Sequence, residues 1–214
     1  MKTLFIPAKV EGKVKITKKI IDKLPKRIGL VTTVQFIDHL YEIRDQLENY
    51  GKKVFIGKGR QEHKGQVLGC DFSSADAIKD KVDAFLYFGS GKFHPIGLAL
   101  KEEKEVFIVM PVTHAFSKIT KEDIEDFNKK KKVGLVKFYA ADTVGILVSS
   151  KPGQCHLNKA IRLKEKLEDK KCYIFISDMI DEREFENFNF IQAWVNTACP
   201  RIESKKIVNI ADIE

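Results

Sequence analysis

The strongest constraint on the fold is an apolar run followed by an amphipathic helix and a second apolar run. Residues 28–34 read Ile-Gly-Leu-Val-Thr-Thr-Val, which is typical of a strand that is buried on both faces. Apolar residues then recur at helical spacing over 36–47, and residues 54–56 form the next expected strand. The order strand, helix, strand predicts a parallel sheet with a right-handed crossover, and therefore an α/β fold built from βαβ units.

The same order returns in the second half of the chain. Residues 144–150 resemble 28–34, and residues 172–177 match the second strand. Between them an amphipathic helix is expected, with one apolar face that carries Leu157, Ile161 and Leu167. Such repetition indicates duplication of one unit. We therefore expect two related small α/β domains, each with a parallel sheet flanked by helices.

These patterns also predict where the domains begin and end. An N-terminal segment, residues 1–27, is expected to consist of a strand near 3–7 and a basic helix, and to be joined to the first domain. The first domain is expected over 28–114 with Cys70, a helical linker over 115–138, and the second domain over 139–214 with Cys199. Thr120 is expected to begin the linker helix as its N-cap, with Asp123 in the third helical position of a capping box.

Charge and cysteine content narrow the classes of function. The chain has 38 Lys and Arg against 30 Asp and Glu, a net charge of +8 that favours an anionic partner. The lysines are spread along the chain, so an ordinary solvated surface explains them equally well. The sequence shows neither a signal peptide nor an apolar stretch long enough for a membrane span, and four cysteines then indicate a reducing, cytoplasmic setting.

Two cysteines lie on loops marked by glycine or proline, where α/β domains display reactive groups. These are Cys70, within Gly65–Ser73, and Cys199, within Val195–Ile202. They are far apart in sequence and form no local metal knuckle, so spacing alone leaves both functional and structural roles open. Cys172 is expected to be a buried core residue. Cys155 is expected on a turn at a helix start, where the helix dipole favours a thiolate.

Several polar residues near the expected strand ends leave two interpretations open. His94, before Pro95, is either an acid–base group or ligand, or a hydrogen-bonded structural histidine. Ser177 and Asp178 either bind a ligand amine or cap the next helix. The glycine loops 57–59 and 89–92 lack the spacing of a P-loop or a dinucleotide fingerprint, which disfavours a nucleotide-binding protein.

Six motifs, in order and covering nearly the whole chain, resemble the family of the first enzyme of diphthamide biosynthesis, archaeal type. They are Leu24-Pro25 with Gly29–Gln35, Ile56–Gly59, Gly65–Cys70, Phe88–Pro95, Ser149–Gln154 and Asn196–Ile202. The resemblance implies three related α/β domains, each of which supplies one cysteine to a [4Fe-4S] cluster. It also implies cleavage of S-adenosylmethionine and transfer of a 3-amino-3-carboxypropyl radical to a histidine of translation elongation factor 2.

The resemblance assigns roles to particular residues of this chain. Cys70 and Cys199 correspond to the cluster ligands of the family's second and third domains. Six further side chains are candidates to hold the methionine part of S-adenosylmethionine because they lie near the expected strand ends: Gln35, Ser90, His94, Gln154, Ser177 and Asp178.

The sequence departs from the family because it starts where the second domain is about to begin, which leaves one cluster ligand unaccounted for. Three explanations stay open: another chain supplies the missing domain, another group such as Cys155 completes the site, or the protein is a cluster-free relative. The first predicts activity only in a homo- or hetero-oligomer, with elongation factor 2 as a partner and no membrane or direct nucleic-acid site. The competing class is a non-catalytic subunit that docks the elongation factor or the enzyme through its basic surface.

Overall fold

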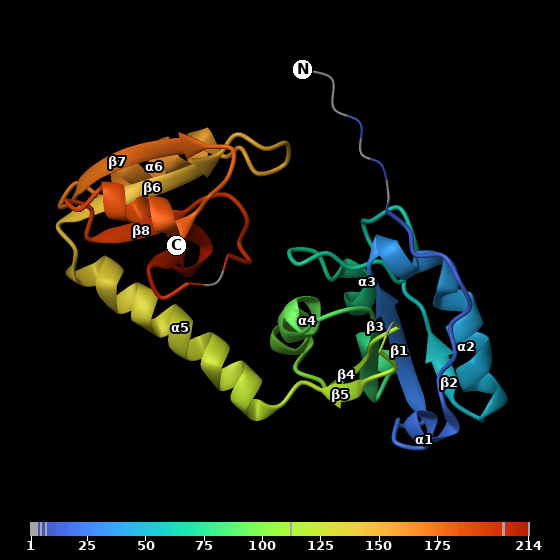
Figure 1. Ribbon diagram of the computed structural model, residues 1–214. Helices are drawn as coiled ribbons and strands as arrows, with labels where there is room; N and C mark the ends of the chain where they lie inside the picture. The colour runs from blue at the N-terminus through green and yellow to red at the C-terminus, as the bar shows by residue number, and fades with distance from the viewer. Residues whose placement is uncertain (1–3, 5, 7, 112, 203, 214) are drawn as a thin grey trace. The chain divides into compact units, whose positions relative to one another are not determined.

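The computed structural model describes residues 4, 6, 8–111, 113–202 and 204–213, and divides into two compact units, Met1–Ile124 and Glu125–Glu214 (Figure 1). Each unit has its own sheet and its own cores. The expected fold class, α/β with two parallel-dominated sheets flanked by helices, is confirmed. No helix in the described part of the chain is long and apolar enough to cross a bilayer.

The first unit is built on a five-stranded sheet in the order β2-β1-β3-β4-β5. The first four strands are parallel and β5 is antiparallel at the edge. Their bounds are β1 Arg27–Thr32, β2 Lys53–Phe55, β3 Ala84–Phe88, β4 Val106–Val109 and β5 Phe116–Lys118. The helices are α1 Lys18–Ile21, η1 Val34–His39, α2 Leu40–Asn49, α3 Ser73–Asp76, η2 Lys79–Lys81 and α4 Phe93–Glu102.

Helices cover both faces of this sheet, as the apolar strand sequences require. Successive residues of a strand point to opposite faces, so Leu30 packs with α1 and α2 whereas its neighbour Val31 packs with α3 and α4. In β3, Leu86 and Tyr87 divide in the same way, and all five residues of this strand are buried. The sheet is therefore the middle layer of three.

The second unit repeats this arrangement with four parallel strands in the order β7-β6-β8-β9. The strands are β6 Thr143–Ser149, β7 Lys171–Ser177, β8 Ala193–Asn196 and β9 Ile207–Asn209. The helices are α5 Lys121–Ala140, which begins in the first unit, and α6 Leu157–Lys166, η3 Glu182–Asn187 and η4 Ile210–Asp212. In both units the first strand in sequence lies between the second and the third. This shared order is what duplication of one unit produces.

Helix α5 starts as expected and ends at Ala140, two residues beyond the expected linker. The hydroxyl of Thr120 accepts from the backbone N–H of Asp123 at 3.2 Å, and the Asp123 carboxylate accepts from the N–H of Thr120 at 3.0 Å. This is a reciprocal capping box. Further along, a Cβ on Gly134 would lie 2.8 Å from the carbonyl oxygen of Ile207, so glycine permits the close approach of α5 to β9. The expected linker, 115–138, thus comprises β5 and most of α5.

One expectation for α6 is wrong, and one for the N-terminal segment stays a prediction. In the strand expected at 3–7, residues 3, 5 and 7 lie outside the described residues, and Leu4 and Ile6 are exposed. In α6 the buried face carries Ala160 and Leu163, whereas Leu157 and Ile161 are exposed. Of the three residues expected on this face, Leu167 alone packs against the core. The small side chain of Ala160 allows the helix to rest on β6, which favours this face over the one with bulkier residues.

Candidate functional site

Cys70 lies on a turn that is fixed to the carboxyl end of β1. The loop folds back on itself where the N–H of Gly65 donates to the carbonyl of Gly57 at 2.7 Å. The backbone of Thr32 then exchanges hydrogen bonds with Gly65 (2.9 Å) and Val67 (2.8 Å), as a strand would. Leu68 and Asp71 close the turn with two backbone hydrogen bonds, and Cys70 between them is exposed.

The buried carboxylate of Asp71 holds this turn from beneath. It accepts from Arg60 Nη2 at 3.0 Å, from Gln61 Nε2 at 2.7 Å and from the backbone N–H of Ser73 at 2.9 Å. Burial acts to raise the pKa of Asp71, but these hydrogen bonds outweigh it and hold the pKa well below its usual range. The residue next to Cys70 is therefore an anionic anchor for the loop.

The glycines of the loop after β2 allow this loop to pack closely against α3. A Cβ on Gly57 would lie 1.9 Å from the carbonyl oxygen of Ser74, and one on Gly59 would lie 2.3 Å from the hydroxyl of Ser73. Only glycine lets this loop press against α3, which directly follows the Cys70 turn. The two glycines thus bring the loop and the helix together around the cysteine.

Cys199 follows β8 and is held by a buried asparagine. Asn196, 1% exposed, donates from Nδ2 to the carbonyl of Cys199 and to the side chain of Asn209, both at 2.6 Å. Its own side-chain oxygen accepts from the N–H of Ala198 at 2.9 Å. Thr197 adds a hydroxyl hydrogen bond of 2.8 Å to the carbonyl of Leu147 in β6. The Cys199 loop is thus tied to β6 and β9, the two neighbours of its own strand.

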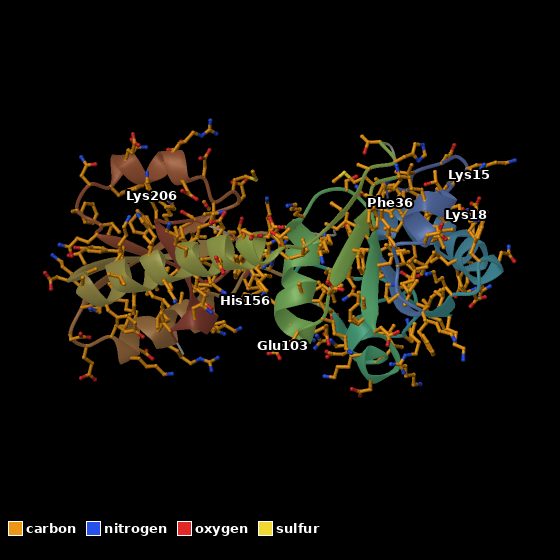
Figure 2. All side chains as sticks on the ribbon, turned by 90° about the horizontal axis from the view of Figure 1, so that it is seen from below. Lys15, Lys18, Phe36, Glu103, His156 and Lys206 are labelled. Atoms are coloured by element: carbon orange, nitrogen blue, oxygen red, sulfur yellow. The ribbon has the colours of Figure 1, made fainter. Side chains whose placement is uncertain are left out.

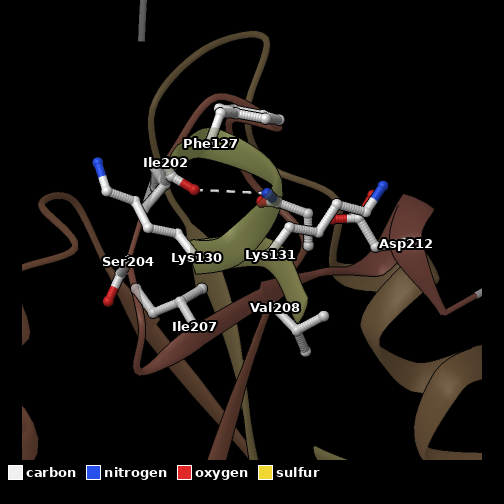
Figure 3. Close-up of a pocket in the computed structure, with 9 residues that line it drawn as sticks. Phe127, Lys130, Lys131, Ile202, Ser204, Ile207, Val208 and Asp212 are labelled. Carbon is white, nitrogen blue, oxygen red and sulfur yellow. Dashed lines mark hydrogen bonds and ion pairs between the residues drawn. The ribbon is translucent and has the colours of Figure 1, made fainter. Parts of the chain in front are cut away.

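A small pocket lies beside the Cys199 loop (Figure 3). Asn209 donates across it to the carbonyl of Ile202 at 3.4 Å, and Lys131 forms a 2.5 Å ion pair with Asp212. Its volume of about 20 Å³ holds little more than one water molecule. The pocket is therefore a polar gap in the support of the loop and is too small for a substrate.

All four cysteines are free thiols. Cys172 is buried in β7, as expected, and burial raises the pKa of its thiol. Cys155 is exposed on the loop before α6. Within the described residues, no three His, Cys, Asp or Glu side chains group closely enough to hold a metal ion. Cys70 belongs to the first unit and Cys199 to the second.

The other predicted residues of the first unit follow β1 and β3. Gln35 is exposed in η1, and Ser90 is exposed in the loop after β3. His94 lies in the first turn of α4 and not in the loop, because proline at the next position is tolerated at a helix start. Its ring stacks on Tyr87, with 5.8 Å between centroids, and its Nδ1 lies 3.3 Å from the tyrosine hydroxyl.

In the second unit, Ser177 is the last residue of β7, and Asp178 follows it in a local turn. The hydroxyl of Ser177 donates to the carbonyl of Met179 at 2.7 Å, and Asp178 Oδ1 accepts from the N–H of Met179 at 2.8 Å. Both side chains are exposed, so capping and ligand binding are compatible. Gln154 is half-buried in the turn after β6, where its backbone N–H donates to the carbonyl of Lys151 at 3.0 Å.

The predicted residues therefore gather at two sheet edges. The carboxyl ends of the first sheet carry Cys70, Gln35, Ser90 and His94, and those of the second carry Cys199, Gln154, Ser177 and Asp178. The sequence analysis missed the supporting Asp71, Asn196 and Asn209. Asp71 had a readable signal, since an aspartate two residues before a serine at a helix start is typical of an Asx turn. Asn209 had none.

Fold and loops together define a class: duplicated parallel α/β proteins that present one cysteine at the carboxyl edge of each sheet. The family model described as "Putative diphthamide synthesis protein" matches residues 1–207, and the chain belongs to this family.

Individual relatives agree with this membership. The chain is 36% identical over 210 residues to the 2-(3-amino-3-carboxypropyl)histidine synthase of Pyrococcus horikoshii, covering 94% of this chain and 59% of the relative. It is 27% identical to the synthase of the same name from Methanocaldococcus jannaschii, covering 94% of this chain and 56% of the relative. The chain thus spans less than two thirds of the length of these two relatives.

A solved structure gives the same result. The crystal structure of Dph2 from Pyrococcus horikoshii with a 4Fe-4S cluster matches with a TM-score of 0.77 and 34% identity. The match covers 91% of this chain and 58% of that one. A second Dph2 structure from the same organism matches with a TM-score of 0.80 and 32% identity, over 94% of this chain and 62% of the other.

Proposed function

We propose that this chain is part of a transferase that moves a 3-amino-3-carboxypropyl group from S-adenosylmethionine to a histidine of translation elongation factor 2. Family membership and the synthase names of its relatives support the reaction class. In this proposal Cys70 and Cys199 are two of the thiolate ligands of a [4Fe-4S] cluster. The solved structure of a relative with a 4Fe-4S cluster supports the choice of cofactor.

The observation that carries the proposal is the way both cysteines are presented. Each thiol is free, sits on a loop whose backbone is held by a buried side chain, and lies at the carboxyl edge of a parallel sheet. Cys70 is exposed and Cys199 is partly exposed, so both can reach an external group. These features fit thiolate ligands, because cluster ligands must be accessible yet fixed in position.

A cluster held by these residues would supply an electron and an open iron position for the sulfonium substrate. The remaining work falls to this chain's own side chains. Gln35, Ser90 and His94 in one unit, with Gln154, Ser177 and Asp178 in the other, offer amide, hydroxyl and carboxylate groups for the amine and carboxylate of the methionine part. The Tyr87 hydroxyl fixes the ring orientation of His94.

A third thiolate has to come from a site other than Cys70 and Cys199. We propose that a partner subunit of the same family, or sequence beyond these 214 residues, supplies it. Cys155 is the alternative within the chain, because it is exposed and precedes α6. Comparison of Cys155→Ser with Cys70→Ser distinguishes the two sources.

The test is anaerobic reconstitution with iron and sulfide, with and without a family subunit that carries the missing cysteine. Iron content and visible absorption are measured for the wild type and for each of four single Cys→Ser variants. The proposal predicts loss of bound iron in Cys70→Ser and Cys199→Ser and retention in Cys155→Ser and Cys172→Ser. An iron-free, colourless wild type in the presence of the subunit contradicts it.

A second candidate function, a non-catalytic docking subunit, is favoured by one observation. The segment before β1 carries four exposed lysines: Lys13, Lys15, Lys18 and Lys19 (Lys15 and Lys18 are labelled in Figure 2). Val14 and Ile16 between them are buried, and Gln46 holds the backbone at both residues, at 2.7 and 2.9 Å. This alternative predicts that Cys70→Ala and Cys199→Ala leave diphthamide formation in cells intact, whereas Lys18→Glu with Lys19→Glu abolishes it.

A further inference from the structure

Strand β7 is a long, open edge of the second sheet. It comes first in the order β7-β6-β8-β9, so in the described part of the chain only one of its sides has a neighbouring strand (Figure 1). It has seven residues, whereas β2, β5 and β9, the other edge strands of the two sheets, have three each. Proteins commonly keep edge strands short, because an open edge pairs readily with another strand.

The sequence of β7 carries none of the features that protect an edge. The strand contains no proline, and its one charged residue, Lys171, stands at its start. All five residues between Lys171 and Ser177 are hydrophobic. The pairing with β6 runs over the whole strand without a break, so no bulge bends the edge away. The open side of β7 is therefore free to accept a further strand.

The backbone hydrogen bonds show which residues of β7 face this open side. The N–H of Lys171 donates to the carbonyl of Asp142, at the start of β6, at 2.7 Å. Because backbone groups alternate between the two sides of a strand, the odd-numbered residues of β7 bond to β6. The N–H and C=O groups of Cys172, Ile174 and Ile176 therefore point to the open edge. Among the described residues, no hydrogen bond from a loop or a side chain reaches these groups.

The three open residues are arranged symmetrically about Ile174. If two β7 strands pair antiparallel with Ile174 opposite Ile174 of the second copy, then Cys172 lies opposite Ile176. Residues opposite each other at such positions exchange two hydrogen bonds. This register therefore satisfies every open N–H and C=O group of both strands, which makes the edge complementary to itself.

The side chains match in the same register. Tyr173 lies opposite Phe175 of the second copy, and aromatic pairs across antiparallel strands are stabilising. On the other face, Ile176, which is 60% exposed in the single chain, is covered by the second copy. Lys171 lies opposite Ser177, so no like charges face each other. Backbone and side chains thus favour the same partner, a second β7.

We propose that two copies of this chain associate through β7, with the two strands antiparallel and a two-fold axis at Ile174. The two four-stranded sheets then form one continuous sheet across the contact. A contact in which the same surface meets itself is closed, so it produces a dimer and no fibre. The proposal rests on the sheet edge alone and is independent of the proposed function.

Sedimentation equilibrium of the full 214-residue chain at micromolar concentrations tests the association. A reversible dimer is expected in the wild type. Ile176→Lys is expected to raise the dissociation constant about tenfold, because the symmetry places the new charge twice between the paired strands. Ile161→Lys is the matched control, since Ile161 is 40% exposed on α6 and not on the edge strand, and it should leave the constant unchanged. A monomeric wild type, or equal constants in wild type and Ile176→Lys, or equal weakening by both variants, overturns the proposal.

Oxidative cross-linking tests the register and keeps the proposal falsifiable if Ile176→Lys does not fold, which thermal unfolding establishes. Opposite Cα atoms of a hydrogen-bonded antiparallel pair lie about 5.5 Å apart, within the range that a disulfide spans. Ile174→Cys, in a background with Cys70→Ser and Cys155→Ser to remove the exposed thiols, is expected to form a covalent dimer with oxidised glutathione. Ile161→Cys in the same background should stay monomeric under denaturing, non-reducing conditions. Equal cross-linking of the two variants, or none in Ile174→Cys, overturns the assigned register.

Discussion

The side-chain amide of Asn196 donates a 2.6 Å hydrogen bond to the carbonyl oxygen of Cys199. The same nitrogen donates to Asn209, so one buried residue connects the cysteine loop to the neighbouring strand β9. The position of the Cys199 loop therefore depends on a buried side chain three residues before the cysteine.

Asn196→Ala tests this dependence. The change leaves the Asn209 side-chain oxygen, the Cys199 carbonyl and the Ala198 N–H without their present partner, so we expect a loss of about 1–3 kcal/mol in unfolding free energy. Chemical denaturation measures it. The iron retained after reconstitution should also fall, whereas Asn128→Ala, on the exposed surface of α5, should change neither quantity. Wild-type iron content in a folded Asn196→Ala variant would show that the loop needs no such support.

Asp71→Asn tests the anchor of the Cys70 turn. Oδ1 accepts from Arg60 and Ser73 while Oδ2 accepts from Gln61, so an asparagine has to turn its NH₂ group toward at least one donor. We expect a destabilisation of about 1–3 kcal/mol and a faster reaction of Cys70 with an alkylating reagent. Asp80→Asn, exposed in η2, is the control. An unchanged alkylation rate at Cys70 argues against the anchor.

The pH dependence of stability tests the environment of Tyr87. Burial raises the pKa of Tyr87 to about 12, because the neutral phenol is favoured in the core. A folded-state pKa above the ordinary value of about 10 contributes stability that is complete below pH 10 and is lost as pH rises through about 12. Tyr87→Phe should remove this part of the alkaline destabilisation. The difference in tyrosinate absorbance between the two proteins measures the titration, and equal slopes of stability against pH would contradict the assignment.

The sequence predicts the framework of the protein because long apolar runs leave few alternatives. The strand at residues 28–34 and its counterpart at 144–150 are correctly expected as central strands, since no other placement buries them on both faces. β9, at Ile207–Asn209, is missed because three residues carry too little periodicity. The prediction of which face of α6 is buried is wrong, because tertiary packing places the small Ala160 in the core instead of the larger Leu157 and Ile161.

The candidate site, too, can be predicted from the sequence only in part. Cys70 and Cys199 are visible in the sequence because glycine or proline marks their loops. Their supports are visible only in part. The contact of Asp71 with the N–H of Ser73 follows a local pattern, whereas Asn196 finds Asn209 only through strand pairing, and Asp71 meets Arg60 only after the loop folds back at Gly65. Contacts of this kind depend on tertiary structure, so no local pattern encodes them.

The most direct test of the central claim is an alkylation footprint of the four thiols before and after anaerobic loading with iron and sulfide, with the subunit that carries the missing cysteine present. Before loading, we expect the exposed Cys70 and Cys155 to react fastest and the buried Cys172 slowest. After loading, Cys70 and Cys199 should be protected together, while Cys155 reacts at its former rate. Unchanged reactivity of Cys70 or Cys199, or protection of Cys155 in place of either, would contradict the claim that these two residues hold the cluster.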